Sequence, residues 1–132
     1  MDSEPQQINN LWNEITDQLS AADLFYGHGA VDAPSEAIWI ISHCLELEPI
    51  EVLDRLDENC STDICNQAKS YAQQRITTRK PLAYILGEAW LMGVPFYSDE
   101  RSIIPRSFIA ELIVDGTLEP WLPPGGRALD LC

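Results

Sequence analysis

The chain has 132 residues, of which 45% are apolar, and its formal net charge is −13. A chain of this length forms about one domain and buries roughly two-thirds of its unfolded surface, so intrinsic disorder is excluded as its main state. No apolar run approaches the ~20 residues of a membrane-spanning helix, and the acidic N-terminus lacks the features of a secretory signal, so we expect a cytoplasmic protein.

The charge is distributed unevenly along the chain. Residues 1–63 hold fourteen acidic residues and one basic residue, whereas residues 64–132 hold seven of each. An acidic surface repels phosphates and attracts basic proteins, so we expect a basic protein partner and no direct nucleic-acid binding by the first half. The alternative is a solvated acidic surface that only keeps the chain soluble.

Four cysteines occur, and none has the C-x-x-C spacing of a common zinc or redox motif: Cys44, Cys60, Cys65 and Cys132. Without an export signal, we expect reduced thiols and neither a disulfide nor a metal site.

In chain order, residues 1–86 predict a helical bundle. A first amphipathic helix is indicated by apolar residues at helical spacing, namely Ile8, Leu11, Trp12, Ile15 and Leu19. After a glycine-containing break, Asp32 is placed to cap a second helix over residues 33–47, with Pro34 and Glu36 in its first turn. The run "AIWIISHCLEL" in this helix is apolar nearly all round, which predicts the central, buried helix.

The rest of the bundle follows from proline and capping signals. Pro49 begins a short helix through Leu56, and Ser61 or Thr62 caps a longer one. The basic residues Arg75, Arg79 and Lys80 suit the end of that helix. Residues 81–86 predict a last helical turn before Gly87.

From Gly87 the pattern changes to strands and turns. Residues 87–104 predict a β-hairpin connector with its turn near 92–95, and a strand that Pro105 ends at Ile104. Ser107 is expected to cap a helix that closes at Gly116, and a proline-rich loop leads to an apolar strand over residues 128–132. The unpaired edge of that strand would favour self-association.

Two segments carry a family resemblance, "PLAYILGEAW" (81–90) and "DERSIIPRSFIAELI" (99–113). They resemble the HemK-like protein-glutamine methyltransferases. The closest similarity is to the PrmB branch, which modifies the third protein of the large ribosomal subunit. "SAADLFYGHG" (20–29) and "LDLC" (129–132) agree with this branch, and the residues after Pro105-Arg106 depart from the release-factor branch.

The resemblance implies a mainly α fold class: an N-terminal helical bundle (1–86) for substrate recognition, the β-hairpin connector (87–104), and the first helix and strand (105–132) of a Rossmann-like methyltransferase domain. In this family the cofactor is S-adenosyl-L-methionine, bound by a glycine-rich turn after "LDLC", and an Asn-Pro-Pro-Tyr motif grips the glutamine amide. Both would lie beyond residue 132, so we expect the chain alone to bind the cofactor poorly and to be inactive. Its partner would be a basic large-subunit ribosomal protein.

The resemblance also indicates cofactor-binding candidates. Arg106 precedes a helix start that would lie near the methionine end of the cofactor, although an ion pair with Glu111 or Asp130 is the structural alternative. Ser107 would either cap the helix or contact the cofactor, Phe96 would either line the site or fill core, and Asp130 would either bind or only orient the next loop.

No catalytic residue is predicted within the chain. His28 in the glycine-containing loop is interpreted as a histidine without a role, and His43 as packed or half-exposed on its helix. His43 and Cys44 are adjacent, so they point to different faces and form no metal pair.

Two other functions are compatible with the sequence. One is a freestanding acidic helical adaptor without catalysis, which the exposed terminal strand argues against. The other is methylation of DNA, which the acidic first half disfavours.

Overall fold

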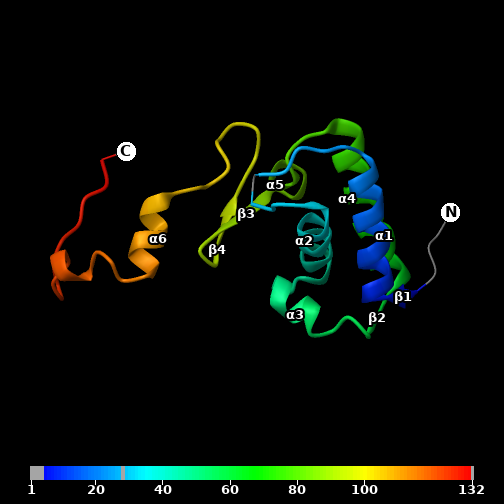
Figure 1. The fold of residues 1–132 in the computed structure, drawn as a ribbon, viewed down its shortest axis with the longest axis horizontal. Coiled ribbons are helices and arrows are strands. Elements are labelled where there is room, and N and C mark those ends of the chain that lie inside the picture. Colours follow the sequence, from blue (N-terminus) through cyan, green and yellow to red (C-terminus); the bar gives the residue numbers. More distant parts are fainter. Residues whose placement is uncertain (1–4, 28, 132) are drawn as a thin grey trace.

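The structure, a computed structural model, describes residues 5–27 and 29–131, so His28 and Cys132 of the sequence predictions lie outside the described residues. Figure 1 shows the helical bundle at one end, the hairpin beside it, and helix α6 with the C-terminus at the other end. The predicted mainly helical class is confirmed, with two small antiparallel sheets. No helix in the described ranges is long and apolar enough to cross a membrane.

Helix α1 (Ile8–Ala21) is the amphipathic helix that the spacing predicted. Its buried residues are Ile8, Leu11, Ile15 and Leu19, all on one face. Just before it, strand β1 (Gln6–Gln7) pairs with strand β2 (Asn59–Cys60), a two-residue pairing that the sequence did not indicate. This pairing holds the start of α1 against the segment that precedes α4.

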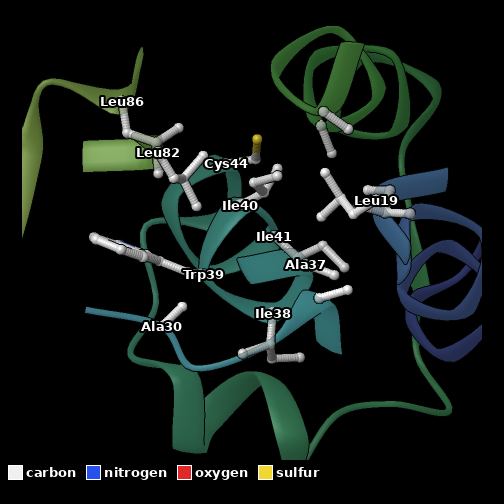
Figure 2. Close-up of a cluster of buried hydrophobic side chains, with 14 of the residues drawn as sticks. Leu19, Ala30, Ala37, Ile38, Trp39, Ile40, Ile41, Cys44, Leu82 and Leu86 are labelled. Carbon is white, nitrogen blue, oxygen red and sulfur yellow. The ribbon is translucent and has the colours of Figure 1, made fainter. Parts of the chain in front are cut away.

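Helix α2 (Ala33–Leu45) is the central helix, as its apolar run predicted. Asp32 caps it by accepting a hydrogen bond from the Ser35 amide at 2.9 Å. It ends two residues before the predicted residue 47 because Glu46 adopts the left-handed conformation (φ 54°). Figure 2 shows α2 surrounded by core side chains, with Leu19 of α1 on one side and Leu82 and Leu86 of α5 on the other.

The remaining bundle helices are α3 (Pro49–Leu53), α4 (Thr62–Thr78) and α5 (Leu82–Leu86). Helix α3 is shorter than predicted, since it ends at Leu53 instead of Leu56. Ser61 caps α4 by accepting from the Ile64 amide at 3.3 Å, so the first of the two predicted caps is confirmed. Arg79 ends α4 in the left-handed conformation (φ 58°).

The predicted hairpin is formed by β3 (Glu88–Leu91) and β4 (Val94–Tyr97). Leu91 pairs with Val94, so the turn consists of Met92 and Gly93 alone, both at positive φ (49° and 77°). This is the two-residue turn whose twist matches that of paired strands. The hairpin leaves most of its apolar side chains at least partly exposed.

Two strand predictions after the hairpin are wrong. Residues 98–107 form no strand before Pro105, and residues 127–131 have no regular structure, with Leu129 and Leu131 over 80% exposed. A strand needs a neighbour to satisfy its backbone groups, and no described segment pairs with either stretch. Helix α6 (Phe108–Val114) does form, followed by a 3₁₀ turn η1 (Glu119–Trp121).

The core is confined to the bundle and its junction with the hairpin. Its buried apolar residues run from Ile8 to Ala89, with Ile104 as the last member, and none of residues 108–114 is buried. Cys44, Cys60 and Cys65 are buried free cysteines.

Candidate functional site

A row of four adjoining hollows runs along the side of the bundle that faces the hairpin and α6. Neighbouring hollows share lining residues: Arg106 and Gly29 line the first two, Trp90 and Gly29 the second and third, and Trp90 also the fourth. We call this row the bundle groove. It connects the segment before α6 with the acidic surface at the start of α3.

The Arg106 end of the groove consists of two hollows. One, of about 270 Å³, is lined by Gly27, Gly29 and residues 103–106. The other, of about 570 Å³, is lined by Trp90 and Leu91 of the hairpin and by Arg106 and Ser107. Arg106 is exposed and takes part in no ion pair with another described residue, so the predicted alternative of a bridge to Glu111 or Asp130 is not formed.

The middle of the groove is aromatic. Trp39 of α2 and Trp90 of β3 line a hollow of about 250 Å³ together with Gly29 and Ala30. A Cβ atom on Gly29 would approach two ring carbons of Trp39 to 3.2 and 3.3 Å, and its φ of +103° already disfavours any other residue. Glycine at 29 therefore lets the loop lie flat against the tryptophan.

The far end of the groove is acidic. A hollow of about 480 Å³ is lined by four glutamates, with His43 and Trp90 among its other walls; the glutamates are Glu46, Glu48, Glu51 and Glu88. His43 Nδ1 lies 2.9 Å from the Glu88 carboxylate, which ties α2 to β3, and its ring meets Tyr71 edge to face at 5.5 Å. His43 is therefore packed and partly exposed, as predicted.

A buried ion pair fixes the loop that forms the groove wall. Arg75 of α4 and Glu36 of α2 are 3% and 4% exposed, and the guanidinium donates to the carboxylate at 2.9 Å. Arg75 Nη2 also donates to the Phe25 carbonyl at 2.8 Å, and Arg79 Nη1 donates to the Ala22 carbonyl at 3.1 Å. Arg75 of α4 and Arg79 at its C-terminal cap thus hold the backbone on either side of residue 23 in place.

The predicted cofactor residues are not all brought together. Arg106 and Ser107 share one hollow, and the Ser107 hydroxyl accepts from the Ala110 amide at 3.3 Å, which confirms its capping role. Phe96 lines a separate hollow on the hairpin beside Tyr97, and Asp130 is exposed in the irregular segment after η1. Cofactor contact by any of the four stays a prediction.

Sequence reasoning missed the parts of the site that depend on contacts between helices. Arg75 and Glu36 were interpreted only as charges at helix ends, and Trp90 only as a family marker. The signal that was available is the spacing of Arg75 within α4: it follows Ala68 and Ala72 at positions that face the core. A charge on a buried stripe indicates a buried partner.

The groove has features suited to binding. An aromatic centre with one acidic end can hold an extended segment through apolar contacts and direct a basic side chain to the carboxylates. Within residues 5–27 and 29–131 no three metal-ligating side chains gather into a potential metal site.

Comparison with known proteins finds a family profile and several relatives that this chain resembles. The profile of the PrmC N-terminal domain matches residues 11–87, from within α1 to the residue after α5. The chain is 38% identical over 129 residues to the ribosomal protein uL3 glutamine methyltransferase of Burkholderia pseudomallei, covering 95% of this chain and 41% of that protein. It is 38% identical over 132 residues to the same methyltransferase of Bordetella pertussis (98% and 44%). With that of Neisseria gonorrhoeae the identity is 39% over 129 residues (95% and 42%). The chain spans about two fifths of the length of these relatives.

Proposed function

Since the chain belongs to the PrmC N-terminal domain family, we propose that it is the substrate-recognition part of a protein-glutamine methyltransferase acting on a large-subunit ribosomal protein. The relatives named above are uL3 glutamine methyltransferases, and they match from α1 to the segment after η1. The observation that carries the proposal is the bundle groove, which joins the Arg106 segment to an acidic hollow.

The acidic hollow fits a basic substrate. Glu46 and Glu48 are exposed at its rim, and Trp90, 40% exposed, forms an aromatic wall beside them. A lysine or arginine side chain can lay its stem on the tryptophan and reach the carboxylates with its charge. Ribosomal proteins that bind rRNA carry many such side chains, and opposite charge also accelerates their encounter with the enzyme.

The exposed face of α6 supports a further domain in the active enzyme. Phe108 is 87% exposed, Ile109 62% and Ile113 59%, an apolar surface that a folded protein normally covers. We propose that this face packs against the remainder of a Rossmann-like methyltransferase domain, of which residues 105–132 form the beginning.

The chemistry assigned to this part of the enzyme is positioning. A glutamine amide nitrogen is a weak nucleophile because its lone pair is delocalised into the carbonyl, so its reaction depends on orientation. S-adenosylmethionine supplies the methyl group when bound. Arg106 and Ser107 share a hollow, whereas Phe96 lines another and Asp130 is exposed in the irregular segment after η1. We therefore expect no appreciable heat when this chain is titrated with S-adenosylmethionine in a calorimeter.

Binding of uL3 tests the recognition role. The chain should bind purified uL3 in fluorescence anisotropy at low salt. Its affinity should fall several-fold once the salt concentration exceeds about 0.1 M, where the Debye screening length is about 10 Å. Replacing both rim carboxylates (Glu46→Gln and Glu48→Gln) should weaken binding about 5- to 10-fold, at ~0.5 kcal/mol or more for each charge. Glutamine keeps an acceptor at position 48, where the carboxylate belongs to the capping box of α3.

A matched control removes the same charge elsewhere. Asp17 and Glu58 are exposed acidic residues outside the groove lining, on α1 and in the connection before β2. The variant Asp17→Asn with Glu58→Gln should lower the affinity by less than twofold. Equal losses in both double variants would show that only net charge matters, and no measurable uL3 binding at low salt would refute the recognition role.

A freestanding acidic adaptor is the second candidate. It is favoured by one observation, that the hydrophobic core is completed within the bundle and the hairpin junction. The gene sequence after the Cys132 codon distinguishes the two: a glycine-rich turn followed by an Asn-Pro-Pro-Tyr motif identifies a methyltransferase, and a stop codon favours the adaptor.

A further inference from the structure

Two cysteine thiols lie in direct contact at the N-terminal edge of the bundle. Cys60 Sγ of β2 and Cys65 Sγ in the first turn of α4 are 3.0 Å apart, and the two residues are 5% and 0% exposed. Neither has a place in the bundle groove. A covalent disulfide has an S–S length of about 2.05 Å, so an approach of about 1 Å would join them.

Local structure explains why the thiols meet. Strand β2 ends at Cys60, Ser61 caps the next helix, and Cys65 follows one helical turn later, so its side chain points back toward the strand. The β1–β2 pairing holds the other side of Cys60, whose thiol donates to the Gln6 carbonyl at 3.3 Å. The Cys65 thiol in turn donates to the Cys60 carbonyl at 3.9 Å, so each sulfur has a backbone acceptor.

From this contact we propose that Cys60 and Cys65 form a reversible intramolecular disulfide when the chain meets a peroxide. The proposal is independent of the recognition function. It also departs from the expectation of permanently reduced thiols, because cytosolic disulfides that do form are of this transient kind.

The reaction balances with the peroxide as the two-electron oxidant. The Cys60 thiolate attacks one peroxide oxygen, an S–O bond forms as the O–O bond breaks, and the departing oxygen leaves as water after taking up a proton. Cys65 sulfur then attacks the sulfenic sulfur, the S–S bond forms as the S–O bond breaks, and the Cys65 proton leaves with that oxygen as a second water. Cys60 is the first to react because it is the less buried of the two.

Burial makes the first step slow, and the proximity of Cys65 makes the second step fast. Burial, with the neighbouring Cys65, raises the pKa of the Cys60 thiol to about 12, so little thiolate forms while the edge is closed. Access comes from local opening of β1–β2, which has only two residues in each strand. Once Cys60 is oxidised, Cys65 is already in place, so further oxidation to sulfinic acid is outcompeted.

A mass measurement tests the proposal in the full chain carrying Cys132→Ser. Trypsin releases residues 56–69 as one peptide, because no lysine or arginine lies between Arg55 and Lys69, and this peptide contains both cysteines. Excess hydrogen peroxide should lower its mass by about 2 Da, and a reducing agent should restore it. Cys44, buried in α2 and carried on a different peptide, is the internal comparison.

Variants of Cys65 distinguish disulfide formation from the addition of oxygen to a single cysteine. In Cys65→Ser the same peptide should gain about 16 or 32 Da instead of losing mass, since the sulfenic acid has no partner. Cys65→Ala gives a second version should serine destabilise the buried site, with circular dichroism confirming the fold of each. The proposal would be overturned if the wild-type peptide gained oxygen. It would also be overturned if the folded chain stayed reduced while the unfolded chain formed the Cys60–Cys65 disulfide under the same peroxide treatment.

Discussion

Replacing Arg75 by methionine tests whether the buried ion pair sets the stability of the bundle. Arg75 donates to Glu36 at 2.9, 3.2 and 3.3 Å, to the Phe25 carbonyl at 2.8 Å and to the Arg79 carbonyl at 3.2 Å. Methionine keeps the apolar stem but removes every donor. The Glu36 carboxylate, 4% exposed, would lose its cationic partner in a place that water barely reaches.

The expected loss is large relative to the total stability. Removing one partner of a buried pair costs about 3–5 kcal/mol, whereas small domains have a free energy of unfolding of about 5–15 kcal/mol. With a urea slope of about 2 kcal/mol per M, the unfolding midpoint should fall by about 2 M. Urea titration followed by circular dichroism at 222 nm, or by tryptophan fluorescence, gives both midpoint and slope.

Two further variants identify the cause of the loss. Arg75→Lys keeps the charge without the guanidinium fork, so it should recover only part of the stability. Glu36→Leu with Arg75→Met removes both charges and should recover at least half of it, because no buried carboxylate is left. A loss below about 1 kcal/mol in Arg75→Met, or a double variant less stable than the single one, would refute the reasoning.

Two other predictions concern titration and the exposed helix. Burial raises the pKa of both Cys44 and Cys60 from 9.0 to about 12, so their contribution to stability is fully present below pH 9 and lost as the pH rises toward 12. Urea midpoints of Cys44→Ser under reducing conditions should therefore fall less steeply over this range than those of the wild type, and parallel curves would contradict the assignment. We also expect the exposed apolar face of α6 to make the chain self-associate. Replacing Ile109 and Ile113 by glutamate should then shift the sedimentation-velocity distribution toward the monomer without changing the urea midpoint, because none of α6 is buried. An unchanged distribution of sedimentation coefficients would show that this face of α6 does not mediate self-association.

The contrast between the terminal strand and α6 shows what local sequence signals can establish. Ser107 and the helical run after it formed α6 even without burial, because a capped helix satisfies its backbone groups internally. Residues 128–132 carry an equally apolar pattern, yet residues 128–131 are irregular and exposed. A strand depends on a neighbour, so its apolar pattern alone could not show whether it forms here.

Family membership did not depend on that strand. Residues 128–131 form an irregular, exposed segment in place of the expected strand. The profile match over residues 11–87 and the identities of 38% over nearly the whole chain show the family although that strand is not formed.

By itself, the sequence determined the helices, their caps at Asp32, Ser61 and Ser107, the hairpin and the acidic first half, since each depends on residues within a few positions of one another. Tertiary structure alone decided that Glu36 meets Arg75 and that His43 meets Glu88, because these partners are 39 and 45 residues apart in sequence. It also decided the groove, in which Gly29, Trp90 and Arg106 line shared hollows from three separate segments. Pairings over such distances are set by how helix faces pack together, and apolar periodicity records which face is buried but not what lies against it.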